Sequence, residues 1–157
     1  MAVRFIRKGE DPALRIVANP VKEIKPVVHR LLDDMLETLR YSDNGLALAA
    51  PQIGISKRLV VIEYDDQLYE LINPEIKEMS GSEVAIEGCL SFPDVWGEVE
   101  RAEHVVVTAR DRNGEPVTIK ADGMLARALQ HEIDHLDGIL FVDKVIQFVD
   151  LDDDTDE

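Results

Sequence analysis

Two histidines four residues apart, with a glutamate directly after the first, are the residues of this chain best suited to chemistry. The segment reads His131-Glu132-Ile133-Asp134-His135, and residues four apart on an α-helix lie about one turn from each other. The two imidazoles can therefore bind one metal ion while Glu132 stays free as a base. Cys89 is the one cysteine of the chain, and its thiolate can supply a third ligand. Three protein ligands leave a fourth position for water, which is typical of a catalytic metal site.

Structural roles for the same residues must be weighed against metal binding. A free cysteine is most often a small buried apolar residue, and a lone histidine is most often structural. The His-Glu-x-x-His spacing changes this balance because it has a mechanical reason to bind metal. His29 and His104 lie in no such pattern, so we assign them structural roles.

Two other classes of protein also carry a helical histidine pair. Extended zinc-protease motifs place a third histidine six residues after the second, where this chain has Phe141, and the one glutamate after His135 is Glu157. A peptidase would therefore lack its usual third ligand, while Cys89 is available. A non-catalytic metal-binding module is the remaining class, and the presence of Glu132 argues against it.

Composition restricts the class of protein and its partners. The chain has 157 residues, of which 45% are hydrophobic, and this predicts one catalytic domain over residues 1–149. Residues 150–157 form an acidic tail that we expect to be disordered. The net charge of −15 argues against binding nucleic acid by neutralising phosphates. No apolar leader or run of ~20 apolar residues occurs, which predicts no membrane association, and the single cysteine suits the reducing cytoplasm.

Hydrophobic periodicity predicts the elements that position the candidate ligands. Helical spacing of apolar residues predicts a helix over residues 26–40, and a second helix from residue 122, with Asp122 as N-cap, to about residue 138. Strands are predicted over residues 58–64, 68–72, 76–79, 83–86, 105–109 and 116–119. The Asn113-Gly114 pair predicts a hairpin between the last two. The fold class is α+β, with mixed, largely antiparallel sheets packed around a central metal-binding helix, plus an N-terminal helix.

The second helix is predicted to turn two faces inward and one outward. The face expected to pack on the sheet holds Leu125, Leu129, Ile133 and Leu136. The face expected to border a pocket holds Met124, Ala128, His131 and His135. The face expected to meet solvent holds Arg127, Gln130 and Asp134.

Three separated segments give the chain a specific family resemblance. They read Gly45-Leu46-Ala47-Leu48-Ala49-Ala50-Pro51-Gln52, Glu87-Gly88-Cys89-Leu90-Ser91 and Gln130-His131-Glu132-Ile133-Asp134-His135. In order and spacing they are similar to the three motifs of the peptide deformylases, and Asp11-Pro12-Ala13-Leu14-Arg15 is similar as well. The resemblance covers nearly the whole chain except the tail. Ala47 stands where the family pattern has its second glycine, beside the substrate.

The resemblance implies a function and roles for the site residues. The reaction is removal of the N-formyl group from the N-terminal methionine of newly made polypeptides, with release of formate. One divalent metal ion is held by Cys89, His131 and His135, with Fe²⁺ as the native ion and Zn²⁺, Ni²⁺ or Co²⁺ as substitutes. Glu132 transfers the proton, and the side-chain amide of Gln52 and the backbone N–H of Leu90 donate to the oxyanion.

Further residues follow from the resemblance and from their closeness to the ligands. An ion pair between Glu87 and Arg101 is expected to support the site from behind. The residues expected to bind the substrate are Gly45, Ala47, Ile86, Met124, Ala128 and the aliphatic stem of Arg127, with Phe92 and Trp96 at the mouth. The partners are N-formylmethionyl peptides. A transient ribosome contact would not use a basic tail, because residues 150–157 are acidic.

Overall fold

The computed structural model describes residues 2–42 and 45–150. The described helices are α1 (Pro26–Tyr41), α2 (Gly123–Leu136) and three short 3-10 helices, η1 (Pro12–Arg15), η2 (Ala50–Ile53) and η3 (Phe141–Asp143). The described strands are β1 (Ala47–Ala49), β2 (Leu59–Tyr64), β3 (Gln67–Ser80), β4 (Glu83–Cys89), β5 (Phe92–Arg101), β6 (His104–Arg110), β7 (Pro116–Asp122) and β8 (Val145–Val149). The predicted α+β class is confirmed. Apart from Asp150, the tail predicted to be disordered lies outside the described residues.

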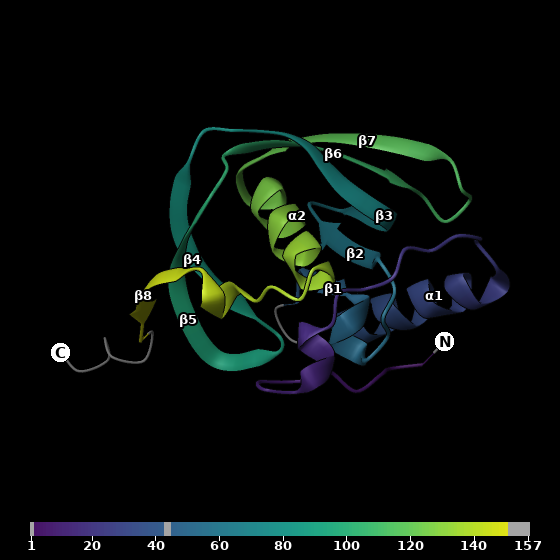
Figure 1. Cartoon of the computed structure of the whole chain (residues 1–157), viewed down its shortest axis with the longest axis horizontal. Helices are drawn as coiled ribbons and strands as arrows, with labels where there is room; N and C mark the ends of the chain where they lie inside the picture. The colour runs from purple at the N-terminus through teal and green to yellow at the C-terminus, as the bar shows by residue number, and fades with distance from the viewer. Residues whose placement is uncertain (1, 43–44, 151–157) are drawn as a thin grey trace.

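Two antiparallel sheets enclose helix α2 (Figure 1). One sheet has the strand order β1-β2-β3-β6-β7, and the other has the order β4-β5-β8. The predicted hairpin around Asn113-Gly114 is confirmed, because β6 and β7 pair from Arg110 with Pro116 to His104 with Asp122. Of the described helices, neither α1 nor α2 combines the length and the apolar character needed to cross a membrane.

Strand β3 replaces two shorter predicted strands. It pairs with β2 up to Ile72 and with β6 from Ile72 onward, with register shifts on the β6 side between Ile72 and Glu75 and between Ile76 and Glu78. Asn73 lies at this change of partner with φ of 55°, a conformation that asparagine tolerates better than most residues. Its side chain accepts a hydrogen bond from the Val21 N–H and donates one to the Val21 carbonyl. The irregularity therefore also anchors the chain segment that leads into α1.

Helix α1 covers one face of the five-stranded sheet, as its apolar periodicity predicts. It begins with Pro26, whose missing N–H costs nothing in the first turn. Strand β2 is buried on both faces: Leu59 and Val61 belong to the apolar cluster with α1, whereas Val60 and Ile62 belong to the cluster with α2. The sheet thus separates two apolar layers, and α2 lies on the side opposite α1.

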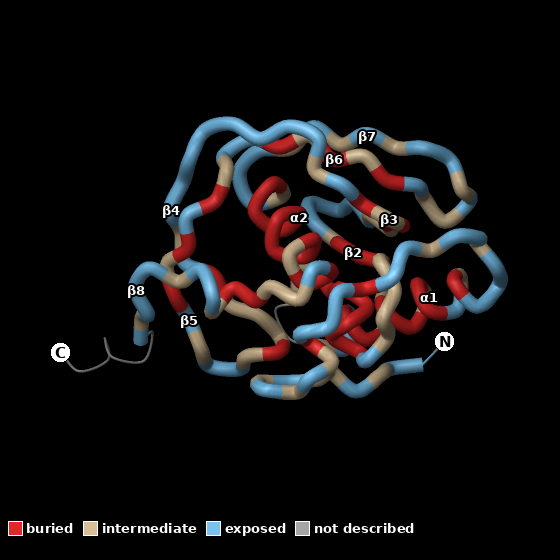
Figure 2. Tube along the Cα trace, viewed as in Figure 1, coloured by how far each residue is buried: buried red, intermediate tan, exposed pale blue. Residues whose placement is uncertain are grey.

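Helix α2 is buried on nearly all sides, which corrects the prediction of a solvent-exposed face (Figure 2). Arg127 is 5% exposed and Gln130 is 4% exposed. Gln130 accepts a hydrogen bond from the Ala102 N–H and donates one to the Ala102 carbonyl, while Asp134 accepts one from Arg101. The polar face of α2 therefore packs against the β4-β5-β8 side, where strand residues take the place of water. Asp122 is the N-cap residue as predicted, although its side chain makes no capping hydrogen bond.

Strands β1, β5 and β8 are not among the predicted elements. Strand β5 contains Pro93, Gly97 and Asp94, whose φ is 65°, and these residues hide the alternation that marks a strand. Strand β8 lies at the edge of its sheet with Ile146 and Phe148 exposed. Exposed and buried side chains do not alternate along β8. Its sequence therefore lacks the alternation of apolar and polar residues that predicts a strand.

A core substitution in α2 tests this arrangement. Leu129 is fully buried, in one cluster with Val60 and Ile62, so Leu129→Ala should lower the free energy of unfolding by about 2–5 kcal/mol. Met79→Ala is the control, because Met79 is 58% exposed on β3 and should change that free energy by less than about 0.5 kcal/mol. Urea denaturation followed by circular dichroism measures both. Equal losses in the two variants would contradict the buried position of α2.

Candidate active site

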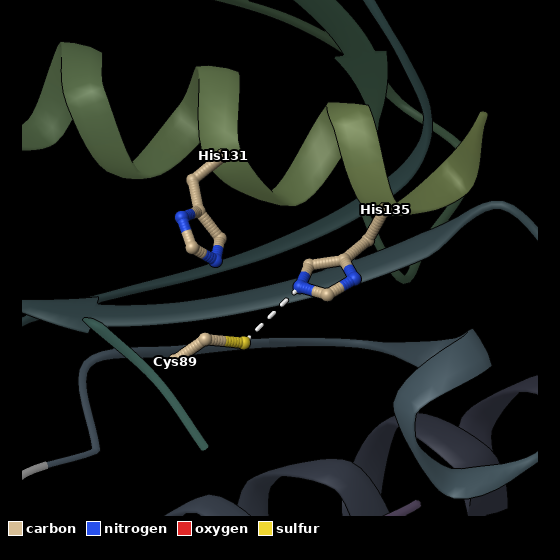
Figure 3. Close-up of side chains that lie close together, drawn as sticks. All are labelled: Cys89, His131 and His135. Atoms are coloured by element: carbon tan, nitrogen blue, oxygen red, sulfur yellow. Dashed lines mark hydrogen bonds between the residues drawn. The ribbon is translucent and has the colours of Figure 1, made fainter. Parts of the chain in front are cut away.

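Three side chains from two elements converge beside α2 (Figure 3). His131 and His135 extend from successive turns of α2, and Cys89 faces them from the end of β4. One ligand atom from each lies within 4.8 Å of the other two. The Cys89 Sγ atom is 3.4 Å from the His135 Nε2 atom. The structure therefore brings together the three residues predicted to bind the metal.

The chemistry of these donors fits one divalent ion. With usual zinc–sulfur and zinc–nitrogen lengths, ligand atoms in a tetrahedral site lie ~3.3–3.6 Å apart, close to the separation of Cys89 and His135. Burial holds the pKa of His135 well below its ordinary value. The His135 ring is therefore neutral, which is the form that binds metals.

The position of Cys89 depends on an irregular hairpin. Strands β4 and β5 are joined by the two residues Leu90 and Ser91, and their register shifts between Glu87 and Cys89. Such a bulge changes the direction in which a side chain points. The extra residues of this irregularity lie on β5, between Phe92 and Gly97. They include Trp96, which covers Gly88 of β4: a Cβ atom on Gly88 would be 2.3 Å from a ring carbon of Trp96. A side chain at position 88 would therefore have to displace the Trp96 ring, which is 37% exposed.

Glu87 fixes the orientation of His131. Its Oε1 atom is 2.9 Å from the His131 Nδ1 atom, and Arg101 donates to both carboxylate oxygens at 2.6 and 2.9 Å. Burial alone would raise the pKa of Glu87, but the hydrogen bonds from His131 and Arg101 outweigh it and hold that pKa well below its ordinary value. Because an ionised carboxylate only accepts hydrogen bonds, His131 Nδ1 must donate. The other ring nitrogen, Nε2, is left for the metal.

Phe141 packs against the same ring. It stacks on His131 with a centroid separation of 5.9 Å and an interplanar angle of 24°. Phe141 occupies the sequence position at which an extended zinc-protease motif would have its third histidine. The residue at that spacing therefore contacts a ligand ring and contributes no ligand atom of its own.

Glu132 lies between the two histidines in sequence and is buried beside them. Its Oε2 atom is 4.0 Å from the His131 Nε2 atom. Its Oε1 atom is buried and has no hydrogen-bond partner among the residues that the structure describes. Burial raises the pKa of Glu132 to about 7, so this carboxyl group can gain or lose a proton near neutral pH. Such a value suits a general acid–base.

Gln52 and Leu90 border the ligands from the other side. Gln52 is 1% exposed in η2, and its Oε1 atom accepts a hydrogen bond from the Ala49 N–H. This leaves its Nε2 atom 3.1 Å from the Ser91 hydroxyl and 3.5 Å from Cys89 Sγ. Leu90 lines the adjoining cavity, and Gln52 contacts Cys89, which is part of the same wall. Two potential donors thus flank Cys89.

A cavity of about 480 Å³ opens in front of these residues. Cys89, His131 and Glu132 form part of its wall. The structure also places in that wall all of the predicted substrate-binding residues, Gly45, Ala47, Ile86, Met124, Arg127 and Ala128, together with Phe92 and Trp96. Most of these side chains are apolar, as a slot for an apolar side chain requires.

The head group of Arg127 is the main feature that the sequence interpretation missed. Arg127 lines the cavity, and its guanidinium donates to Glu87 Oε2 at 2.7 Å. The signal was present in the sequence, because Arg127 precedes His131 by four residues and therefore shares its side of the helix. No local pattern showed that Glu87 would approach both residues.

The sequence model of the family described as polypeptide deformylase matches residues 3–150. The chain belongs to this family. It is 57% identical over 153 residues to the peptide deformylase of Acetivibrio thermocellus, covering 98% of this chain and 89% of that protein. It is 56% identical over 149 residues to the peptide deformylase of Caldicellulosiruptor bescii, covering 95% of this chain and 89% of that protein.

Solved deformylase structures have the same fold. The crystal structure of the Thermotoga maritima peptide deformylase superposes with a TM-score of 0.89 at 40% identity, over 92% of this chain and 99% of that one. The Synechococcus elongatus structure, in complex with actinonin, gives a TM-score of 0.87 at 45% identity, over 90% of this chain and 78% of that one. The chain therefore belongs with the deformylases, and not with the zinc peptidases or the non-catalytic metal-binding modules that were the alternatives for the histidine motif.

Removal of a ligand tests the metal site. Cys89→Ser and His131→Ala should weaken Zn²⁺ or Co²⁺ binding by more than the ~10–100-fold typical of losing a residue that only supports a ligand. His29→Ala is the control, because the His29 ring contacts the Arg112 carbonyl away from the site. Competition with a coloured chelator measures the dissociation constants. Metal binding that survives in Cys89→Ser with wild-type affinity would contradict the assignment of the ligands.

Proposed function

We propose a mechanism by which this member of the peptide deformylase family removes the N-formyl group from the N-terminal methionine of new polypeptides. Cys89, His131 and His135 hold one divalent ion, and Glu132 transfers the proton. The observation that carries the proposal is that Cys89, His131 and His135 form one cluster of potential ligands, and that Cys89, His131 and Glu132 lie in the wall of one cavity. The bound ion supplies Lewis-acid polarisation and an activated water nucleophile at neutral pH.

Glu132 is the general base and then the general acid. Its carboxylate, whose Oε2 atom is 4.0 Å from His131 Nε2, accepts a proton from water beside the ligands, and its pKa of about 7 lets it return that proton. The returned proton goes to the amine of methionine as the bond between the formyl carbon and the nitrogen breaks. Formate and a peptide with a free amino terminus leave, so the net reaction consumes one water.

Gln52 and Leu90 stabilise the negative charge that develops on the formyl oxygen. The Gln52 Oε1 atom is already bound to the Ala49 N–H, which directs its Nε2 atom toward Cys89. Leu90 follows Cys89 in the tight turn and can offer its backbone N–H on the cavity side. Each such donor typically contributes about 3–4 kcal/mol to transition-state stabilisation.

The substrate class follows from the shape and polarity of the cavity. An apolar wall that includes Ile86, Met124 and Ala128 suits the methionine side chain of an N-formylmethionyl peptide. Gly45 and Ala47 line the cavity from the other side and lie beside the peptide backbone. A deformylase structure from Acinetobacter baumannii, 38% identical to this chain, is described with Met-Ala-Ser bound, which supports a methionyl peptide as the ligand here.

The native ion and the setting of the reaction complete the proposal. A thiolate, two imidazoles and a water accept several first-row ions, and availability decides among them. We assign Fe²⁺ as the native ion, with Zn²⁺, Ni²⁺ or Co²⁺ as substitutes. The reaction takes place in the cytoplasm, where new chains emerge. Contact with the ribosome is transient and does not use a basic tail, because residues 150–157 contain six acidic and no basic residues.

Substitution of Glu132 separates catalysis from metal binding. Glu132→Gln keeps the shape of the side chain but removes the group that accepts the proton, so kcat for formate release should fall by about 10²–10⁴-fold. The bound metal should stay at one ion per chain, because Glu132 is not a ligand. Formate release from a formyl-methionyl tripeptide and the metal content of the same sample are measured together. Retained activity would refute the role of Glu132, and lost metal would show that Glu132 belongs to the ligand set.

A further inference from the structure

Arg127 has its two ends in different environments. Arg127 lines the cavity proposed for the methionine side chain, yet the whole residue is only 5% exposed. Its guanidinium donates to the Glu87 carboxylate at 2.7 Å and to the backbone carbonyls of Val99 and Glu83 at 2.9 and 2.7 Å. A buried cation is costly unless paired and hydrogen-bonded, and these three acceptors provide both.

The contact with Glu87 completes a saturated carboxylate. A carboxylate has about four acceptor sites. Arg101 fills two of them, His131 fills one and Arg127 fills the last. Arg101 already forms the bidentate pair that neutralises Glu87, so charge balance alone does not require Arg127. Its added effect is to restrain the remaining freedom of Glu87, and so the direction of the Oε1 atom that holds His131.

We propose that Arg127 is a positioning residue that couples the methionine slot to the metal ligand His131. The coupling runs through three contacts: the substrate side chain against the Arg127 stem, the Arg127 guanidinium with Glu87, and Glu87 with His131 Nδ1. This inference rests on the proposed function, because it needs a metal at His131 and an apolar side chain in the cavity. A side chain that fills the slot restrains the arginine, and the arginine then restrains the ligand.

A purely structural role is the alternative, because the bonds from Arg127 to Glu83 and Val99 also tie α2 to β4 and β5. Gln130 provides a matched control for that role. It is equally buried in α2 and ties the helix to the Ala102 backbone, but none of its hydrogen bonds within the described residues goes to Glu87. Loss of the Gln130 contacts should therefore lower stability and leave the metal site unchanged.

The first experiment compares Arg127→Met, Arg127→Lys and Gln130→Met. Methionine keeps an apolar stem and removes the guanidinium, so Arg127→Met should bind Zn²⁺ about 10–100-fold more weakly than the wild type. Arg127→Lys retains one donor and should give an intermediate affinity. Gln130→Met should lower the melting temperature but keep wild-type metal affinity. Unchanged metal affinity in a folded Arg127→Met overturns the proposal. If Arg127→Met does not fold, wild-type metal affinity in Arg127→Lys overturns it.

The second experiment measures the coupling itself. The peptides Met-Ala-Ser and Ala-Ala-Ser present the same amine and backbone and differ only in the first side chain. At saturation, Met-Ala-Ser should tighten Zn²⁺ binding to the wild type more than Ala-Ala-Ser does, by about 5-fold or more, as expected for coupled sites. The two peptides should act equally in Arg127→Met, or in Arg127→Lys if that is the variant that folds. If the two peptides differ in the variant by as much as they do in the wild type, the coupling is overturned. If the wild type binds no Zn²⁺, the proposed function is overturned instead.

Discussion

The burial of α2 between two sheets is the constraint on which the rest of the structure depends. Polar side chains on a helix that is buried on nearly all sides are mostly paired with protein groups. The apolar residues of α2 pack on the five-stranded sheet. Its polar residues, among them Arg127, Gln130 and Asp134, bond to groups on or beside β4 and β5. His131 is held in the same way, through Glu87 of β4, so the packing that stabilises the fold also orients this ligand.

The electrostatics of the site follow from this burial. Glu87, Arg101, Arg127 and Asp134 form a chain of charges in which each carboxylate meets at least one guanidinium. Removing Glu87 would leave Arg127 buried without its ion-pair partner, which typically destabilises a protein by about 3–5 kcal/mol. The same network excludes Glu132, whose carboxyl is desolvated and has a pKa raised to about 7. Pairing thus keeps Glu87 ionised for support, and desolvation leaves Glu132 free to exchange a proton.

Local sequence patterns predicted the features that depend on neighbours in the chain. The His-Glu-x-x-His spacing, the amphipathic residues of α1 and the Asn113-Gly114 turn each contain their own geometric reason, and the structure has the corresponding elements. Strand β5 was missed because Pro93, Asp94 and Gly97 interrupt its pattern. The polar face of α2 was misread as solvent-exposed because a helix that bonds to a second sheet has the same periodicity as one that meets water. Only the tertiary structure shows that β4 and β5 cover that face.

Formate release measured while metal is added stepwise to the metal-free protein tests the central claim most directly. Cys89, His131 and His135 form the one cluster of three potential ligands found among the described residues. Release from a formyl-methionyl tripeptide, measured without oxygen, should therefore rise in proportion to added Fe²⁺ or Ni²⁺ and level off at one ion per chain. Formate release without added metal, or a plateau at another stoichiometry, would contradict a reaction carried by a single ion at these residues.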